Sequence, residues 1–137
     1  MGFWLSLNIS FCDKIDTIMD SIDNRAELLR KIKDEVLCVE GSLCKERIKN
    51  NVFPVIGEGS HYAEVMFIGE APGKNEAETG RPFCGAAGKV LDELLKSISL
   101  ARKEVYVANI LKDRPPSNRD PLPKEIELYS PFLDRQI

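Results

Sequence analysis

The feature that most constrains the fold is a short apolar segment followed by a glycine-rich loop and an amphipathic helix. Residues 65–68 (VMFI) have the length and composition of a buried strand, and Gly69 ends the apolar run. Pro72 and Gly73 then favour an irregular, acidic loop. Apolar residues return at helical spacing from Val90 to Ile98. This order is typical of an α/β protein with a parallel sheet, which binds ligands at the carboxyl ends of its strands, so we expect a site in the loop.

Length, charge and cysteine content narrow the class of protein. The chain has 137 residues, enough for one domain with a core. Its net charge of -3 gives no general attraction to nucleic acid, so DNA binding would need a local basic patch. No apolar segment is long enough for a membrane span. Residues 2–11 lack the basic start of a signal peptide. Four cysteines in a chain without an export signal favour a reducing compartment. We therefore expect a cytoplasmic monomer with no membrane partner.

Residues 15–37 carry the clearest helical pattern, with apolar side chains on one face and charges on the other. This pattern predicts a helix that packs on the sheet. We accordingly divide the chain into an N-terminal extension of residues 1–14 and a domain of residues 15–137. A last helix is expected to begin at Ser130, an N-cap residue that is followed by Pro131 in the first turn.

Two nucleotide-binding motifs fail to match the glycine-rich loop. The Rossmann fingerprint requires G-x-G-x-x-G, a spacing that the glycines of this loop do not provide. A P-loop requires G-x-x-x-x-G-K-[ST], whereas the interval from Gly69 to Gly73 is one residue short and Lys74 is followed by Asn75. These spacings disfavour a nucleotide-binding module.

The loop does resemble the first motif of the family 4 uracil-DNA glycosylases, GEAPG-x-x-E followed by G-x-PF-x-G-x-AG. The matching residues are Gly69-Glu70-Ala71-Pro72-Gly73, Glu76, Gly80, Pro82-Phe83, Gly85 and Ala87-Gly88. Residues 105–119 (VYVANILKDRPPSNR) resemble the family's VYIANIVKCRPP-x-NR, and residues 125–137 resemble EI-x-x-C-x-PFL-x-RQI. The resemblance implies a three-layer α/β/α fold with a parallel central sheet, of which this chain is the N-terminal portion, incomplete at the C-terminus.

The resemblance also implies an enzyme of base-excision repair that hydrolyses the N-glycosidic bond of uracil in DNA. In the family, a later histidine stabilises the departing uracil anion. The one histidine here, His61, precedes the first strand and would lie on the wrong side of the sheet for that role. We therefore expect this chain alone to be inactive or very slow. The alternative is a non-catalytic DNA- or base-binding remnant of the same fold.

Family members hold a 4Fe-4S cluster through cysteines, and the matching positions here are altered. Cys44 matches the second cysteine of the first pair, but Cys38 is too far from it for the usual C-x-x-C spacing. The other two positions hold Asp113 and Tyr129. Because thiolates are the chief ligands of such clusters, we expect no cofactor, with Cys38 and Cys44 as vestigial ligand candidates. The thiols are otherwise expected to be buried or partly buried.

Asn109 is the most informative residue of the second predicted strand, residues 105–111. A buried amide without partners costs about 1–3 kcal/mol, so it must bond either to neighbouring backbone or to a ligand. An amide places a donor beside an acceptor, which complements the O4 and N3–H edge of uracil. The resemblance implies that Asn109 binds uracil in this way, and we count it among the catalytic residues.

The resemblance assigns further roles around the loop. Phe83 would stack on a uracil flipped out of the duplex, and Glu76 would help to exclude the methyl group of thymine. Gly69 and Ala71 would line the pocket with backbone groups. In other relatives an aspartate at the position of Ala71 activates the attacking water, so Glu70 is the candidate for positioning that water here.

A basic loop follows the second predicted strand. Lys112, Arg114 and Arg119 stand among four prolines beside the proposed pocket. Such a charge run is commonly a solvated face, but its place next to the pocket predicts contact with DNA phosphates.

Overall fold

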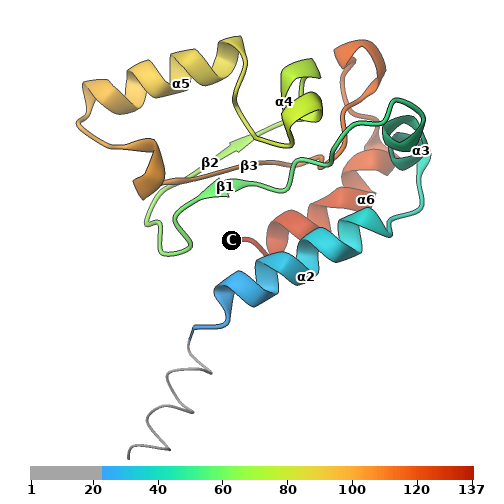
Figure 1. Cartoon of the computed structure of the whole chain (residues 1–137), viewed down its shortest axis with the longest axis horizontal. Helices are drawn as coiled ribbons and strands as arrows, with labels where there is room; N and C mark the ends of the chain where they lie inside the picture. The colour runs from blue at the N-terminus through green and yellow to red at the C-terminus, as the bar shows by residue number, and fades with distance from the viewer. Residues whose placement is uncertain (1–22) are drawn as a thin grey trace, which may run out of the picture.

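The computed structural model describes residues 23–137 (Figure 1). The predicted extension, residues 1–14, and the first part of the helix predicted for residues 15–37 lie outside this range. In chain order the elements are α2 (Arg25–Leu37), α3 (Ser42–Lys49), β1 (Glu58–Gly59), β2 (Met66–Gly69), α4 (Lys74–Thr79), α5 (Ala86–Ser97), η1 (Arg102–Glu104), β3 (Tyr106–Asn109), η2 (Pro116–Asn118) and α6 (Pro123–Asp134).

The three strands of the described chain form one sheet in the order β1-β3-β2. β2 and β3 are parallel, with Met66 opposite Tyr106 and Gly69 opposite Asn109. β1 pairs with the other edge of β3 and is antiparallel, so the sheet is mixed and the expected parallel arrangement holds between β2 and β3. Gly59 explains the close pairing there, because its φ is +129° and a Cβ on it would lie 1.9 Å from the carbonyl oxygen of Val105.

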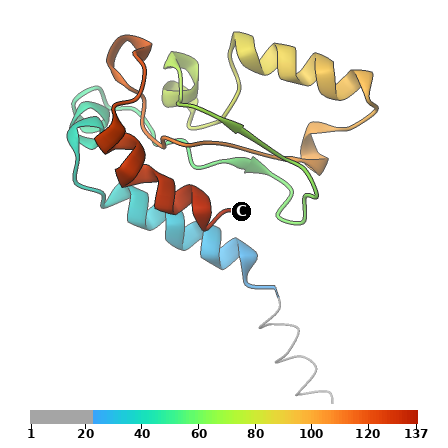
Figure 2. The same cartoon turned by 180° about the vertical axis from the view of Figure 1, so that it is seen from behind.

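Helices cover both faces of the sheet, as Figures 1 and 2 show with α5 on one side and α2 and α6 on the other. The side chains of the buried β3 strand alternate between these two layers. Val105 and Val107 pack against Leu91 and Leu95 of α5. On the other face Tyr106, Ala108 and Leu133 of α6 form a separate cluster. The α/β class is confirmed, and the described elements form three layers.

The C-terminal helix differs from its predicted start. α6 begins at Pro123, seven residues before Ser130, and contains Pro131 in its interior. The carboxylate of Glu125 accepts a hydrogen bond from the backbone N–H of Leu122 at 2.9 Å, which fixes the first turn. Proline is also favoured at the first helical position, so Pro123 marks the true start.

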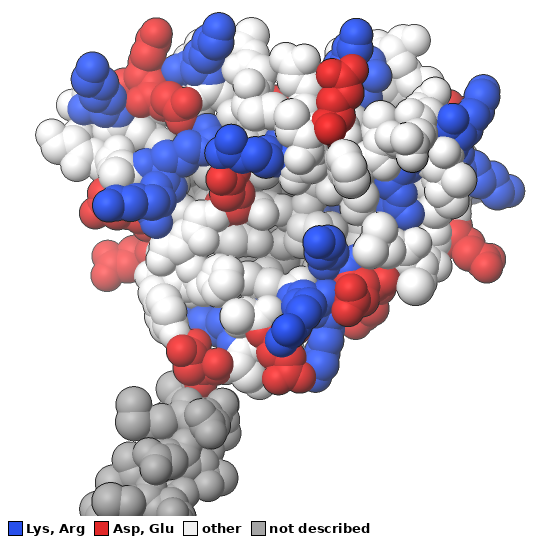
Figure 3. Space-filling model, in the orientation of Figure 1, with Lys and Arg blue, Asp and Glu red and all other residues white. Residues whose placement is uncertain are grey.

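Two further observations concern the whole of the described chain. None of its helices has the length and apolar composition required to cross a membrane. Basic and acidic side chains are interspersed over the face shown in Figure 3, in keeping with the small net charge. A contact with nucleic acid would therefore depend on local groups.

Candidate functional site

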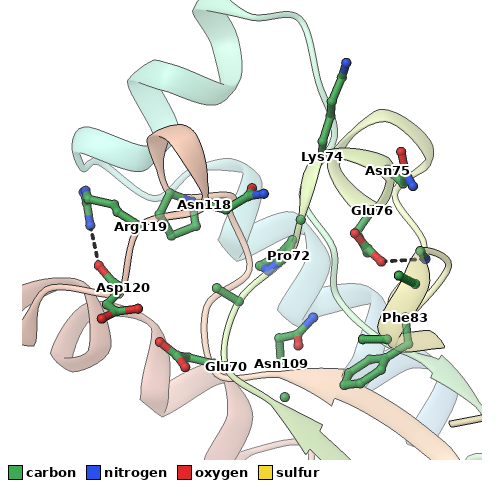
Figure 4. Close-up of a pocket in the computed structure, with 17 residues that line it drawn as sticks. Glu70, Pro72, Lys74, Asn75, Glu76, Phe83, Asn109, Asn118, Arg119 and Asp120 are labelled. Carbon is green, nitrogen blue, oxygen red and sulfur yellow. Dashed lines mark hydrogen bonds between the residues drawn. The ribbon is translucent and has the colours of Figure 1, made fainter. Parts of the chain in front are cut away.

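A cavity of about 520 Å³ opens at the carboxyl ends of β2 and β3 (Figure 4). Three segments form its wall: the loop after β2 with the start of α4, the segment that leads into α5, and the segment after β3. Its lining includes the sequence-predicted residues Gly69, Glu70, Ala71, Glu76, Phe83, Asn109 and Arg119. Lys112 and Arg114 are absent from the lining.

The parallel pairing of two strands brings the central residues together. Gly69 and Asn109 are the last residues of β2 and β3 and are direct partners in the register. The pairing continues past the strand ends, because the N–H of Ile110 donates to the Gly69 carbonyl at 2.9 Å and the N–H of Leu111 donates to the Glu70 carbonyl at 3.1 Å. The loop that carries the acidic motif is thereby held directly over the end of β3.

Phe83 and the Asn109 side chain lie on the same side of the sheet. A Cβ added to Gly69 would lie 2.3 Å from Oδ1 of Asn109 and 2.6 Å from Cζ of Phe83, so both side chains converge above this glycine. Figure 4 shows the amide and the ring as neighbours at the base of the cavity. The inner part of Phe83 packs against the cluster of Leu91 and Val107. Only glycine leaves room for this arrangement at position 69.

The side-chain amide of Asn109 is free to bind a ligand. The residue is only 3% exposed. Within residues 23–137, the side-chain amide makes no hydrogen bond to the protein, and the contact from Nζ of Lys112 at 2.7 Å goes to the Asn109 backbone carbonyl. Of the two interpretations that the sequence leaves open, the bond to neighbouring backbone is therefore not made. A donor and an acceptor face the cavity instead.

Glu76 supports the segment that carries Phe83. Its Oε1 accepts hydrogen bonds from the backbone N–H groups of Cys84 at 3.1 Å and Gly85 at 2.9 Å. Phe83 itself has a positive φ of 49°, an unfavourable conformation for a residue with a side chain, and these two bonds hold the turn on its C-terminal side. Glu76 therefore fixes the ring as well as lining the cavity.

Two carboxylates lie on the opposite wall of the cavity. Glu70 is exposed, and in Figure 4 its side chain extends from the loop after β2 towards Asp120. Asp120 also lines the cavity, although the sequence analysis did not single it out. Only its position after the basic loop could have indicated it. Ala71 contributes to the wall and packs partly against the core cluster of α2 and α6.

Lys112 does not serve as a contact for DNA, because its side chain is fully buried. Its Nζ donates to the backbone carbonyl of Asn109 at 2.7 Å, to the side-chain oxygen of Gln136 and to the carbonyl of Ile56. Burial lowers the pKa of Lys112 to about 8. The assignment of Lys112 to phosphate contact is wrong: this lysine ties the end of β3 to the end of α6.

The two arginines of the basic loop are partly exposed and both have protein partners. Arg119 forms a two-pronged ion pair with Glu125, at 2.9 and 2.6 Å, which raises the pKa of the guanidinium. The same pair lowers the pKa of the Glu125 carboxyl. Nε of Arg114 donates to Oδ1 of Asn118 at 2.7 Å. Because this amide is neutral, the contact does not compensate the positive charge of Arg114. Arg114 is therefore the stronger candidate for a phosphate.

The residues at the expected cluster positions do not fit an iron–sulfur cluster. Nη1 of Arg47 lies 3.0 Å from both carboxylate oxygens of Asp113, and the Tyr129 hydroxyl donates to Oδ2 of Asp113 at 2.6 Å. Nη2 of Arg47 lies 3.3 Å from Sγ of Cys44, so a cation stands beside the one well-placed thiol. Cys38 is exposed, contrary to the expectation of a buried or partly buried thiol. Among the described residues no group of His, Cys, Asp or Glu side chains could hold a metal ion.

His61 lies away from the cavity. It lines a second hollow of about 440 Å³, between the start of α2 and the end of α6, with neighbours that include Arg25 and Arg135. The sequence-based placement of this histidine outside the pocket agrees with its position.

Comparison with known proteins identifies a family and several relatives that are similar to this chain in sequence. The family described as the uracil DNA glycosylase superfamily matches residues 56–137. The chain is 51% identical over 111 residues to a type-4 uracil-DNA glycosylase of Sulfurisphaera tokodaii, covering 80% of this chain and 49% of the relative. It is 46% identical over 119 residues to the type-4 enzyme of Archaeoglobus fulgidus, covering 87% of this chain and 55% of the relative. The chain thus spans about half the length of these relatives.

Proposed function

The chain belongs to the uracil DNA glycosylase superfamily, and from this premise we propose that its cavity binds a uracil flipped out of DNA and serves hydrolysis of the N-glycosidic bond in base-excision repair. The similarity to type-4 enzymes over most of this chain supports the proposal. Because the chain covers about half the length of those relatives, the activity is proposed from the part of the site that this chain contains.

The observation that carries the proposal is the free amide of Asn109 beside the ring of Phe83. The amide faces the cavity without a protein partner, so its donor and its acceptor are both available to a ligand with a complementary edge. Uracil offers an acceptor at O4 next to a donor at N3, whereas cytosine reverses this pattern at the same atoms. Asn109 would therefore discriminate between the two bases by hydrogen bonding.

Phe83 supplies the second requirement, a surface on which a base can stack. A base removed from the duplex loses a few kcal/mol of stacking and pairing, which an aromatic side chain in the pocket partly restores. The cavity volume of about 520 Å³ lies in the range of small-molecule sites. The fixed position of the ring, held through Glu76, keeps the base in register with the amide of Asn109.

Hydrolysis requires a water molecule that attacks C1′ and a stabilised leaving uracil anion. Glu70 is the candidate for positioning this water, and Asp120 lies where it could assist by the same chemistry. Most of the rate gain would come from binding the distorted nucleotide and from stabilising the negative charge on uracil. Phosphates flanking the flipped nucleotide would contact Arg114, with Arg119 and Lys74 at the rim of the cavity.

The remaining expectations stay part of this proposal. The chain would act as a monomer in the cytoplasm, with uracil-containing DNA as partner and without a metal cofactor. The division into an extension of residues 1–14 and a domain of residues 15–137 is retained. The second candidate function is binding without catalysis, and it is favoured by the position of the one histidine, His61, outside the cavity.

One experiment distinguishes the two functions. The 137-residue chain is incubated with a single-stranded oligonucleotide that contains one uracil, and alkali then cleaves any abasic site. Strand scission at uracil that is lost in Asn109→Ala supports an enzyme, and binding without scission supports the second function. Asn50→Ala is the matched control, because Asn50 is exposed directly after α3 and, among the described residues, its side chain bonds to Glu46 alone. Equal binding of the uracil oligonucleotide and a thymine counterpart would contradict recognition of uracil in this cavity and leave only binding to the DNA backbone.

A further inference from the structure

Two buried charged groups of the described chain, Arg47 and Asp113, form a network with Tyr129 outside the cavity. The side chain of Arg47 is 5% exposed and that of Asp113 is 0% exposed. Arg47 holds both carboxylate oxygens of Asp113 at 3.0 Å, and Tyr129, itself fully buried, donates to the same carboxylate at 2.6 Å. Arg47 also donates to the carbonyls of Val36 at 3.4 Å and Leu37 at 3.2 Å. Each charged group is therefore paired and hydrogen-bonded, as a buried ion pair requires.

This network joins four parts of the chain that are distant in sequence. Val36 and Leu37 end α2, Arg47 belongs to α3, Asp113 follows β3, and Tyr129 belongs to α6. The hydrophobic cluster around Tyr129 contains Val36 and Leu43, so the network lies against this part of the core. Loss of Arg47 or Asp113 would leave the opposite charge buried without its counter-charge, so the network specifies how these elements meet.

The network lies directly behind one wall of the cavity. Asp113 is four residues beyond Asn109 and two residues before Pro115, and both of these residues line the cavity. Between them, the backbone carbonyl of Lys112 accepts from the N–H of Val55 at 2.7 Å. The segment from Asn109 to Pro115 is thus anchored on the side away from the cavity, with Arg47 and Tyr129 as its fixed points.

We propose that Arg47, Asp113 and Tyr129 form a metal-free brace that takes over the structural place of an iron–sulfur cluster and positions the cavity wall after β3. Asp113 and Tyr129 occupy positions where the resemblance places two cysteine ligands of the cluster. Cys44 occupies the position of a third cysteine ligand, and the guanidinium of Arg47 places a positive charge next to its thiol. A guanidinium repels an iron cation and needs hydrogen-bond acceptors for its own donors. The carboxylate of Asp113 supplies these acceptors, and the hydroxyl of Tyr129 donates to the same carboxylate. The three residues are positioning residues and have no contact with the base. The expectation that a damaged brace weakens base binding rests on the proposed function, whereas the structural role of the brace does not.

Thermal unfolding of single and combined variants tests the brace. Arg47→Met leaves the buried carboxylate of Asp113 without its counter-charge and is expected to lower Tm by roughly 10–20 °C. Tyr129→Phe removes one hydroxyl and is expected to lower Tm by roughly 3–8 °C. Arg47→Met combined with Asp113→Leu should melt higher than Arg47→Met alone, since no charge is left unpaired. Arg81→Met, at the exposed pair with Glu58, is the matched control and should change Tm by about 2 °C or less. Additive losses in the combined variant would overturn the brace.

Hydrogen exchange tests whether the brace positions the wall. In Tyr129→Phe, which keeps the ring and the packing, amide exchange should accelerate over residues 111–120 while α5, on the other face of the sheet, keeps its protection. Binding of the single-uracil oligonucleotide should weaken roughly 3-fold in the same variant. If the unaltered chain does not bind this oligonucleotide, the proposed function fails and exchange alone decides the brace. Unchanged exchange over residues 111–120 would overturn it.

Iron analysis tests the replacement of the cluster. The full chain is produced in iron-supplemented cells, and a second sample is treated with ferrous iron and sulfide under anaerobic conditions. The expected result is less than stoichiometric iron and sulfide, no broad visible absorption band and a Tm unchanged by a chelator. Stoichiometric iron and sulfide that disappear in Cys38→Ser would show that thiols still hold a cluster and would overturn the proposal.

Discussion

The burial of Lys112 predicts an unusual dependence of stability on pH. The ammonium group is removed from water and held by three carbonyl-type oxygens, those of Asn109, Gln136 and Ile56. Burial lowers the pKa of Lys112 in the folded chain to about 8 from its ordinary value of 10.5. Below pH 8 both the folded and the unfolded chain carry the proton, so the folded state bears the full cost of the buried charge.

The sign of the effect follows from the order of the two pKa values. Between pH 8 and 10.5 the folded chain releases this proton while the unfolded chain retains it, so stability rises with pH. At about 1.4 kcal/mol per pH unit, Lys112 is expected to add about 2 kcal/mol between pH 7.5 and 9.5, out of a total of about 3 kcal/mol. Burial raises the pKa of Tyr106 above 10.0, so Tyr106 instead lowers stability above that pH. Measurements therefore end at pH 9.5.

Urea unfolding followed by circular dichroism at pH 7.5, 8.5 and 9.5, at constant ionic strength, measures this slope. Lys112→Met should remove the rise with pH, although it also lowers stability at every pH because the Asn109 carbonyl loses its donor. Lys103→Met is the matched control, since Lys103 is exposed and should keep the slope of the unaltered chain. A flat or falling stability in the unaltered chain, or an equal slope in Lys112→Met, would refute the reasoning.

Three further predictions concern the cavity. Glu76→Ala removes the acceptor for the N–H groups of Cys84 and Gly85, so the uracil oligonucleotide should bind about 10-fold more weakly by fluorescence anisotropy, whereas Glu78→Ala on the exposed side of α4 should not weaken it. Gly69→Ala places a Cβ 2.3 Å from Oδ1 of Asn109 and should abolish uracil binding in the same assay; retention of binding would contradict the convergence of the two side chains. Arg114→Ala should reduce the slope of log K against log salt concentration by about 1, and an unchanged slope would exclude a phosphate contact.

The main strand pair could be predicted from the sequence because its signals are local. Both apolar segments were identified and their expected parallel pairing is confirmed, and the structure adds the register, with Gly69 opposite Asn109. β1 could not be predicted, since two residues without alternation become a strand only by pairing with β3. α4 has six residues, too few for a helical pattern, and follows the loop signals of Pro72 and Gly73. The start of α6 was misjudged because Pro131 resembles a first-turn proline but stands inside the helix.

The site was accessible from the sequence only where a motif fixed it. Motif spacing indicated that Asn109 and Phe83 share a site, but not that the amide would be free of protein partners. Lys112 was misassigned because its neighbours in sequence, Asp113 and Arg114, suggest a solvated loop, whereas its contacts at Gln136 and Ile56 are long-range. Charge alone does not tell a buried cation from an exposed one.

Arg47 shows most clearly how distant residues determine one another here. In sequence it is one of several cations in a charged helix, and its partner Asp113 lies 66 residues away. The absence of cysteine at positions 113 and 129 indicates only that cluster ligands are missing, not what stabilises the region instead. A buried carboxylate is costly without a paired cation, so Asp113 requires Arg47. Arg47 in turn places a positive charge 3.3 Å from Sγ of Cys44, which disfavours a metal ion at that thiol. The same short segment thus presents a free amide to the cavity at Asn109 and a fully paired carboxylate to the core at Asp113. The base recognition proposed for one side can be rigid because the charges on the other side are satisfied.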